Sequence, residues 1–457
     1  MLGAYIVALF ASASLVAVDV SPDRTNAIYA CGERARLTVT VIDKASGRKH
    51  DAGCLRFRLD DFGSVVVSEG EVDLARSNPF ELSGTLEKSG VLRLKVSAKD
   101  GAFAVEPRAG QYDWAWGAAF GVSELKPTQP CPADFAAFWK NARANLDRTV
   151  PVDPQMTEVQ SMETGTARFY RISVASYKRR VHGLMSIPKS SEGPLPVWVY
   201  VPGAGCADWS NYIPELGSPA INVMLSVFPW DVGWENGGRE TMVKYKAMMA
   251  EIKAKWGVDN YGQAGLVAAA REDYFFYPVI LGCVRALECL AAMPQVDSRR
   301  MYYYGSSQGG GLGIALTALF GRFAAAGCMV PAFCDLDAES AGRQGDWPIG
   351  GMGKAFREKA KANACYFDAC NFSRFIKTPV TYEAGGGDCV NPPHCVLAAY
   401  AVCPSAGKRL VFIPAQGHDA SGEACRQVQA WIGSHRLDRL PRIRSGVCFR
   451  VNQSQQQ

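Results

Sequence analysis

The sequence has little of what metal, nucleic-acid or membrane binding requires. It contains only five histidines, and no Cys/His spacing in it is typical of a zinc site. It has no internal repeat and no apolar run long enough to span a bilayer. Its 49 basic and 44 acidic residues nearly balance, and they form no basic stripe. We therefore expect no metal, no nucleic-acid partner and no membrane span.

The N-terminus has the features of an export signal. Residues 1–17 are small and apolar, carry no Lys or Arg, and offer Ala11-Ser12-Ala13 as a cleavage site. This pattern predicts a secretory signal peptide, although the usual positive segment is missing and a buried first strand is the alternative. The mature protein is then expected to be secreted or periplasmic.

The 15 cysteines fit an oxidising compartment. Pairs such as Cys31 with Cys54, or Cys365 with Cys370, are candidates for disulfides. Because the number is odd, at least one thiol is free or pairs outside the chain. Buried free cysteines that act as small apolar side chains are the alternative for many of them.

A chain of 457 residues is long enough for two or three domains. Between residues 18 and 105 apolar and polar residues alternate, as in Leu37, Val39 and Val41 with threonines between them. This period is typical of half-buried strands. We expect residues 18–105 to form a small all-β sandwich of immunoglobulin-like type. Residues 106–130, rich in aromatic residues and glycine, are interpreted as a linker.

Residues 131–440 follow a different pattern, in which short apolar runs alternate with helical segments. A helix is expected first, from near Cys131 to Leu146. Alternating strands and helices indicate a mostly parallel sheet covered on both faces, and the order predicts an α/β protein with the α/β-hydrolase fold. Residues 441–457 are expected to be disordered. The expected strands are Leu195–Val201, Ile221–Val227, Met301–Tyr304, Ala324–Met329, Pro379–Ala384 and Leu410–Ile413.

The motif Gly305-Ser306-Ser307-Gln308-Gly309 lies between an expected strand and a helical run of small residues. This context is typical of a nucleophile elbow, in which a strained turn exposes the serine. The flanking glycines lack the Cβ atoms that would clash in such a turn. Ser307 is therefore the candidate nucleophile, and an ordinary glycine-rich turn is the alternative.

A serine nucleophile needs a base, and that base needs a carboxylate to orient it. In hydrolases of this fold the acid and then the histidine follow the serine, which excludes His50 and His182. His435 ends a helix, where it complements the helix dipole, and His394 lies only six residues after the best acid. His418, in the loop after the last expected strand, is therefore the predicted general base.

The best acid is Asp388. It follows an expected strand and the turn Gly385-Gly386-Gly387, and paired prolines after it stiffen its loop. Asp335 and Asp337 lie too near the strand and helix of the nucleophile, and Asp368 lies inside a helical segment. Asp388 is thus predicted to orient the base.

A tetrahedral intermediate also needs fixed N–H donors for its oxyanion. One candidate is the backbone of Gln308, directly after the nucleophile. The other is the backbone of Ala204, in the turn Pro202-Gly203-Ala204-Gly205 after a strand. A plain glycine turn is the alternative for this second position.

With these residues assigned, the chain resembles the acetyl xylan esterase and cephalosporin-C deacetylase family of α/β-hydrolases from about Cys131 to Ser434. The elbow continues as Ser-Gln-Gly-Gly-Gly, which is the family's pattern. The other matching stretches follow in the family's order. They are Pro132-Ala133-Asp134-Phe135 with Phe138-Trp139, Val296-Asp297-Ser298-Arg299-Arg300, Val330-Pro331-Ala332-Phe333-Cys334-Asp335, Tyr366-Phe367-Asp368-Ala369, Asp388-Cys389-Val390-Asn391-Pro392-Pro393 with Ala399-Tyr400, and Gly417-His418-Asp419.

The resemblance implies a role for each candidate. Ser307 is the nucleophile, His418 the general base and then acid, and Asp388 its orienting partner, with oxyanion donors from Gln308 and Ala204. It implies hydrolysis of a short acyl ester, above all acetyl on a sugar hydroxyl, through an acyl-enzyme and without a cofactor. The expected partner is an acetylated carbohydrate. Members of the family often form hexamers, so the resemblance allows a homo-oligomer, although an added sandwich could block that assembly.

Three departures from the family's pattern concern the substrate pocket. Phe228-Pro229-Trp230-Asp231 stands where the family has Arg-Gly-Gln, Ala204 replaces an aromatic residue, and the segment from Trp230 to Tyr261 differs. They leave two alternatives open. The chain could hydrolyse larger esters or peptides on the same fold, or it could bind polysaccharide with a degenerate hydrolase domain.

Overall fold

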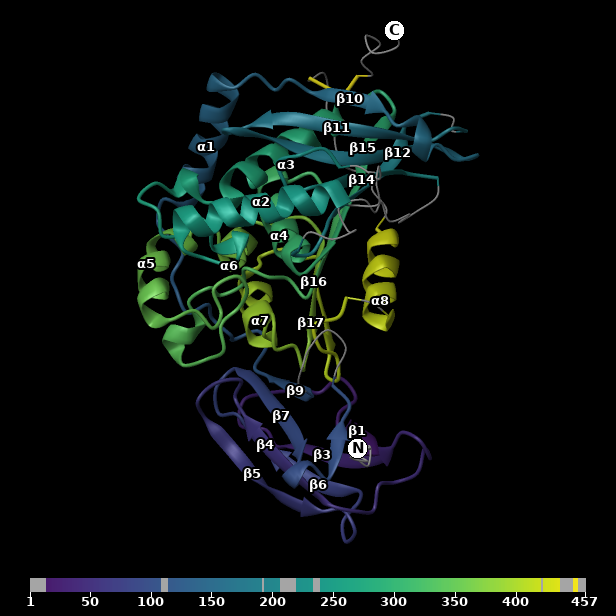
Figure 1. Cartoon of the computed structure of the whole chain (residues 1–457), viewed down its shortest axis with the longest axis vertical. Helices are drawn as coiled ribbons and strands as arrows, with labels where there is room; N and C mark the ends of the chain where they lie inside the picture. The colour runs from purple at the N-terminus through teal and green to yellow at the C-terminus, as the bar shows by residue number, and fades with distance from the viewer. Residues whose placement is uncertain are drawn as a thin grey trace, which may run out of the picture.

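The computed structural model describes residues 14–107, 114–190, 193–205, 219–232, 239–420, 422–435 and 447–450. Most of the predicted signal peptide and most of the predicted tail therefore lie outside the described residues. An all-β region forms one end of the molecule and a larger α/β region forms the rest (Figure 1).

Two sheets make up the N-terminal region, with strand orders β6-β3-β1-β8 and β2-β9-β7-β4-β5. Their inner faces meet, since a Cβ on Gly84 of β6 would lie 2.6 Å from Leu92 of β7 and 3.5 Å from Leu59 of β4. An immunoglobulin-like topology stays a prediction. The strands are β1 (Ser14–Pro22), β2 (Ile28–Tyr29), β3 (Ala35–Asp43), β4 (Cys54–Asp60), β5 (Val66–Asp73), β6 (Phe80–Gly84), β7 (Gly90–Ala98), β8 (Phe103–Val105) and β9 (Ala115–Phe120).

Two predicted boundaries of this region need correction. The strand β1 begins at Ser14 and buries Val16 completely, so the predicted signal peptide overlaps it, and cleavage after Ala13 would keep it whole. The strand β9 lies inside the predicted linker, residues 106–130. All its residues are buried. A strand buried on both faces shows no alternation of apolar and polar residues, which is why the sequence did not indicate it.

The α/β region is built on one sheet of order β10-β11-β12-β14-β13-β15-β16-β17-β18. The strands from β14 to β18 run parallel, and the pairs from β10 to β14 are antiparallel. All six predicted strands are present. The strands are β10 (Gln155–Glu158), β11 (Ala167–Ser176), β12 (Arg179–Pro188), β13 (Leu195–Val201), β14 (Ile221–Leu225), β15 (Val296–Ser306), β16 (Ala325–Met329), β17 (Val380–Gly385) and β18 (Lys408–Ile413).

Helices cover both faces of this sheet, with α8 on one side and α3, α4 and α7 on the other (Figure 1). Among the described residues, no helix is both long and apolar enough to cross a membrane. The helices are α1 (Phe135–Thr149), α2 (Arg239–Trp256), α3 (Phe276–Ala291), α4 (Gln308–Phe320), α5 (Lys354–Ala364), α6 (Ala369–Ser373), α7 (Pro393–Val402) and α8 (Gly422–Gly433).

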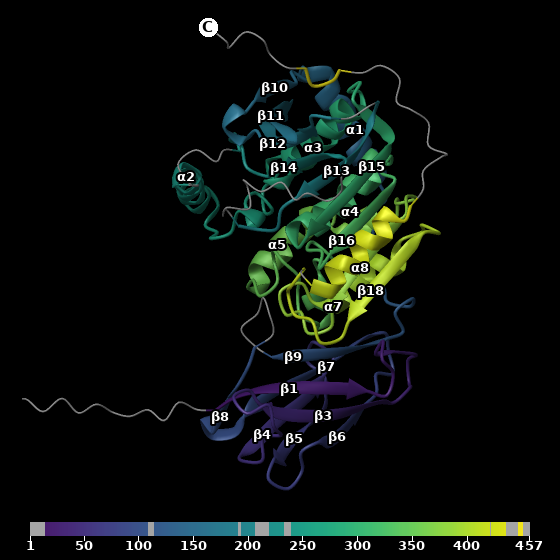
Figure 2. The same ribbon diagram turned by 90° about the vertical axis from the view of Figure 1, so that its right-hand side faces the viewer.

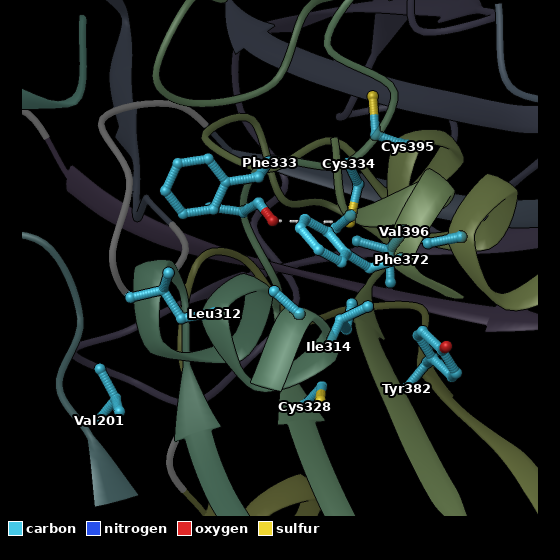
Figure 3. Packing of buried hydrophobic residues seen from close by; sticks show 14 of the residues in the cluster. Val201, Leu312, Ile314, Cys328, Phe333, Cys334, Phe372, Tyr382, Cys395 and Val396 are labelled. Atoms are coloured by element: carbon cyan, nitrogen blue, oxygen red, sulfur yellow. Dashed lines mark hydrogen bonds between the residues drawn. The ribbon is translucent and has the colours of Figure 1, made fainter. Parts of the chain in front are cut away.

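The helix α4 lies in the apolar core. Its residues Leu312 and Ile314 pack among Val201, Phe333 and Tyr382 (Figure 3), and all of these side chains are buried. Burial of one such aliphatic side chain contributes about 1.5–3 kcal/mol. This packing fixes α4 against the sheet, and with it the turn that precedes the helix.

The predicted disulfides are absent from the described residues, in which every cysteine is a free thiol. The sulfur atoms of Cys31 and Cys54 each lie against a glutamate carboxylate rather than against each other. Those of Cys365 and Cys370 are buried and contact backbone groups. The alternative expectation, of cysteine as a small apolar side chain, describes the buried ones better.

Candidate active site

Ser307 forms the turn between β15 and α4, as the sequence predicts. Its backbone has φ +55° and ψ −121°, a strained conformation that costs a non-glycine residue about 1–3 kcal/mol. A Cβ on Gly309 would overlap the carbonyl oxygen of Val201, and one on Gly305 would lie 2.7 Å from the carbonyl oxygen of Gly309. The two glycines of the motif are therefore needed for the close approach of three backbone segments.

His418 and Asp388 come together with Ser307 at the carboxyl edge of the sheet. The Nε2 atom of His418 lies 3.1 Å from Ser307 Oγ, and its Nδ1 atom lies 2.9 Å from Asp388 Oδ2. Asp388 is fully buried, and its Oδ1 atom accepts hydrogen bonds from the backbone N–H groups of Val390 and Asn391, at 2.8 and 2.9 Å. One carboxylate oxygen is thus held by the loop and the other is left for the imidazole.

The environment of His418 favours a basic imidazole. Burial disfavours the imidazolium, but the charge of Asp388 and its hydrogen bond outweigh burial, and Asp419 adds to them. The pKa of His418 is therefore raised above its ordinary value of 6.5. A raised pKa makes this side chain a stronger proton acceptor when it is neutral.

Both predicted oxyanion residues lie beside the nucleophile. Gln308 is the first residue of α4, where backbone N–H groups have no acceptor within the helix. The turn that carries Ala204 is close, since a Cβ on Gly203 would lie 3.7 Å from Ser307 Cβ. The side-chain amide of Gln308 donates to the carbonyls of Pro202 and Gly203, at 3.2 and 3.3 Å. It ties the turn to the start of the helix.

A cavity of about 870 Å³ opens at Ser307. The turn that carries Ala204, the two loops of His418 and Asp388, and the helix α8 line it. Val330, Trp347 and Val390 contribute apolar side chains to the lining, and Tyr200 and Tyr304 contribute phenol rings. The Tyr304 hydroxyl lies 3.0 Å from the sulfur of Cys425 in α8. The site therefore has room for a substrate much larger than an acyl group.

The sequence model of the acetyl xylan esterase family (AXE1) matches residues 121–435. The chain belongs to the acetyl xylan esterase family. It is a carboxylic ester hydrolase. The acetyl esterase Axe7A of Xylanibacter ruminicola is 27% identical over 420 residues, which cover 90% of this chain and 89% of that protein. A match of that extent reaches into the N-terminal region, which the family model leaves out.

Solved structures show the same fold. An acetyl xylan esterase from Paenibacillus sp. R4 aligns with a TM-score of 0.54 at 21% identity, over 69% of this chain and 98% of that one. Acetyl xylan esterase 1 from Thermoanaerobacterium sp. JW/SL YS485 aligns with a TM-score of 0.54 at 23% identity, over 68% and 98%. Both relatives are covered almost in full, so the fold that they share with this chain accounts for about two thirds of it.

Tyr261 supports the turn that carries Ala204, the predicted oxyanion turn, through contacts that sequence analysis missed. Its hydroxyl donates to Gln308 Oε1 at 2.7 Å and accepts from the backbone N–H of Gly205 at 3.0 Å. The residue lies in a short helical turn, Tyr261–Gln263, and is buried. No motif of the sequence indicated it, because the contact joins segments that are 47 and 56 residues apart.

An aromatic cluster occupies the position of the absent Arg-Gly-Gln motif. The rings of Phe228 and Trp230 stack with centroids 5.0 Å apart, and Phe228 contacts the ring of Tyr261 edge-on at 5.4 Å. Asp231 pairs with His182 of β12 at 2.7 Å, and this hydrogen bond holds the pKa of Asp231 below its usual range. Phe228, which stands in place of the family's motif, thus packs against Tyr261, the residue that contacts the turn with Ala204.

Glu383 and Gln416 form a second contact that sequence analysis missed. Glu383, in β17, is fully buried and accepts from Gln416 Nε2 at 2.6 Å and from the backbone N–H of Val330 at 3.0 Å. Gln416 also donates to the carbonyl oxygen of Asp419, next to the base. Burial raises the pKa of Glu383 to about 8, against the effect of its two donors.

The rejected candidates lie elsewhere. His394 is buried and its Nε2 atom lies 2.9 Å from the carbonyl oxygen of Gln344, and burial lowers its pKa to about 3. Asp335 accepts from Thr128 and pairs with Arg343 at 3.0 Å. The others bond within their own surroundings, namely His435 to Trp431, Asp337 to Lys361, and Asp368 to Leu336 and Cys370.

Proposed function

We propose that this protein is an exported serine esterase that removes acetyl groups from carbohydrate. The observation that carries the proposal is the chain of contacts from Asp388 through His418 to Ser307, with the serine held in a strained turn. Membership of the acetyl xylan esterase family supplies the substrate class. The named relatives are an acetyl esterase and acetyl xylan esterases.

In the first half of the reaction, Ser307 Oγ attacks the carbonyl carbon of the ester and His418 Nε2 takes the hydroxyl proton. The carbonyl oxygen becomes an oxyanion and accepts from the N–H groups of Gln308 and Ala204. The imidazolium then gives its proton to the sugar oxygen as the C–O bond breaks. The sugar leaves with its hydroxyl restored, and acetyl remains on Ser307.

In the second half, water replaces the sugar. His418 takes a proton from water, whose oxygen attacks the acyl carbon, and the same N–H groups bind the second oxyanion. Collapse of this intermediate returns that proton to Ser307 Oγ and releases acetic acid, which gives up the second proton of the water to solvent and becomes acetate. The chain's own residues provide every group that these steps require.

The cavity supports a carbohydrate as the alcohol part of the substrate. The apolar side chains of Val330 and Val390 line the cavity that contains Ser307, and burial of an acetyl methyl group against them would be favoured by the hydrophobic effect. The two tyrosines and the polar side chains of α8 add hydrogen-bonding groups to the same lining. A sugar offers both apolar faces and hydroxyl groups, which suits such a mixed lining.

Export rests on the N-terminal sequence. Residues 1–13 lie outside the described structure, and β1 begins at Ser14, directly after the Ala11-Ser12-Ala13 site. Cleavage there would release a domain with its first strand complete. N-terminal sequencing of the protein recovered outside producing cells would test this part, and a retained Met1 would contradict it.

The test of the enzymatic proposal is hydrolysis of 4-nitrophenyl acetate and butyrate by the full chain, with Ser307→Ala beside it. We expect acetate to be preferred, acetylated xylan to release acetate, and kcat in the variant to fall by about 10⁶, the effect of removing a serine nucleophile. Retention of more than a few per cent of turnover in Ser307→Ala would exclude the proposed nucleophile. Preference for longer esters or for a peptide anilide would instead favour a different hydrolase.

A further inference from the structure

The strand β9 is the part of the N-terminal region that meets the catalytic loops. It lies at the boundary between the two regions, below α7 and β18 in Figure 2. The backbone N–H of Gly117 in β9 donates to the carbonyl oxygen of Pro414 at 3.0 Å. Pro414 follows β18 and begins the loop that carries His418. A strand of one region thus bonds directly to the loop of the proposed base.

The loop of the proposed acid is packed between β9 and that His418 loop. A Cβ on Gly117 would overlap the carbonyl oxygen of Gly386, and a Cβ on Gly387 would overlap that of Ala115. On the side of the acid loop that faces the His418 loop, the backbone N–H of Gly386 donates to the carbonyl oxygen of Ile413 at 2.8 Å. The backbone N–H of Gly387 donates to the carbonyl oxygen of Gln416 at 2.9 Å. Three backbone segments therefore touch with no side chain between them.

A chain of side chains reaches the far end of the acid loop. Buried Asp60 holds Arg93 of β7 through two hydrogen bonds, at 2.8 and 3.0 Å, and the guanidinium lies over the ring of Phe62 at 4.5 Å. Arg93 donates to Gln344 Oε1 at 2.8 Å, and Gln344 Nε2 donates to the carbonyl oxygen of Cys389 at 2.6 Å. Cys389 is the residue directly after the proposed acid.

We propose that the N-terminal region is part of the catalytic apparatus, because β9 and Arg93 position the Asp388 loop against His418. Gly117, Arg93 and Gln344 are positioning residues in this view, since they act through the loop and touch no substrate. The inference rests on the proposed triad. It differs from a glycan-binding role for the N-terminal region, and from a role as a structural cap.

The first test is Gly117→Ala, with Gly90→Ala in β7 as its matched control. An added methyl at Gly117 would push on Gly386, whereas one at Gly90 would lie 3.6 Å from Leu86, an ordinary contact. We expect Gly117→Ala to lower kcat on 4-nitrophenyl acetate by about 10–100-fold, since small misplacements of catalytic groups have effects of that size. KM should stay within about twofold, because substrate contacts are unchanged.

The pH profile separates positioning from a general loss of structure. Because Asp388 raises the pKa of His418, a displaced acid loop should move the lower midpoint of kcat/KM to lower pH. Gly90→Ala should leave both kcat and the midpoint at wild-type values. A smaller amount of correctly folded enzyme would lower activity without moving the midpoint.

Gln344→Glu is the second variant, in case Gly117→Ala does not fold. The carboxylate keeps an acceptor for Arg93 but loses the N–H that bonds the Cys389 carbonyl. We expect about a tenfold loss of kcat, since small misplacements of catalytic groups have effects of at least that size, while KM stays within about twofold of the wild type. Wild-type kcat in a folded Gln344→Glu, or wild-type kcat and midpoint in a folded Gly117→Ala, would overturn the proposal. The proposed triad would be unaffected by that result if kcat of Asp388→Asn is strongly reduced. Full activity of Asp388→Asn would remove the triad, and the positioning role with it.

Discussion

The two sides of Ser307 are held by different means. On the side of the acid and base, backbone packs directly on backbone, through Gly385, Gly386 and Gly387. On the oxyanion side, the side chains of Gln308 and Tyr261 tie the turn to α4 by hydrogen bonds. The glycine contacts of the first side are sensitive to an added atom, and the hydrogen bonds made by Gln308 and Tyr261 on the second side are sensitive to a lost polar atom.

This difference matches what the proposed mechanism would require of each side. The imidazole has to keep one orientation through two proton transfers, and close-packed backbone provides a rigid support for it. The oxyanion turn has to admit the substrate carbonyl, so it is open to the cavity and is fixed from behind. Each side can be changed separately, which lets the comparison be tested.

Among the changes that test this comparison, the largest effect is expected from Asp388→Asn. The two backbone N–H groups that bond Oδ1 would keep the amide oxygen on their side, so the NH₂ group would face His418 Nδ1. That contact favours the tautomer with the proton on Nε2, which cannot accept from Ser307. We expect kcat to fall by about 10⁴, as for such a change in a serine protease triad.

The pH dependence gives the check on this variant. Activity requires neutral His418, so kcat/KM of the wild type should rise with pH through a midpoint above 6.5, because its pKa is raised. In Asp388→Asn the residual activity should show a lower midpoint, since the charge that raises the pKa is gone. An unchanged midpoint would mean that another carboxylate sets the pKa of the base.

A smaller effect is expected from Tyr261→Phe on the oxyanion side. The loss of the hydroxyl leaves Gln308 Oε1 and the Gly205 N–H without this partner, and the turn with Ala204 is less well fixed. We expect kcat to fall about tenfold, less than the 10²–10³ for loss of a whole oxyanion donor. KM should change little.

The matched control is Tyr382→Phe, which also removes a buried hydroxyl. That hydroxyl lies 2.9 Å from Ser373 Oγ, away from the oxyanion turn. Thermal unfolding should show a comparable loss of stability in both variants. A loss of kcat in Tyr261→Phe alone would then support the role of Tyr261 in fixing the oxyanion turn. Equal kcat in the two variants would show that the turn is fixed without Tyr261.

Local patterns predicted most of the α/β region. The run Leu195–Val201 matches β13 in both bounds, because a parallel strand buried on both faces is a continuous apolar run. Ser307, Asp388 and His418 could be chosen from the order of the chain and the ends of strands, and the structure brings all three together. Their catalytic roles stay a proposal until the variants are measured.

What the sequence could not indicate depends on contacts between distant segments. The strand β9 has the same buried character as β13, but its Trp-Gly-Ala-Ala composition is typical of a linker as well, and only its pairing with β7 and β2 makes it a strand. Tyr261 and Gln344 act through single hydrogen bonds to other segments. Such bonds follow no period and no motif, so they are visible only in the folded chain.

The smallest expected effect on catalysis is that of Glu383→Gln, a change beneath the acid and base loops that acts on the pH dependence of stability. The pKa of Glu383 is raised to about 8 in the folded protein, above the ordinary 4.5 that applies when it is unfolded. The folded state therefore binds more protons between pH 5 and pH 8, and its stability falls as pH rises through this window. Glutamine is neutral throughout, so the variant should lose this part of the pH dependence.

The measurement is urea unfolding of both proteins at pH 5, 6, 7 and 8. The wild type should lose more free energy of unfolding than Glu383→Gln over this range, by an amount on the order of a few kcal/mol. Because Glu383 accepts from both Gln416 Nε2 and the Val330 N–H, the NH₂ group of glutamine would face one of these donors and would lower the stability of the variant by a similar amount at every pH. The difference in pH dependence is therefore the readout. Parallel pH curves for the two proteins would show that Glu383 is charged in the folded state, and the loops of Asp388 and His418 would then rest on a carboxylate instead of a neutral acid.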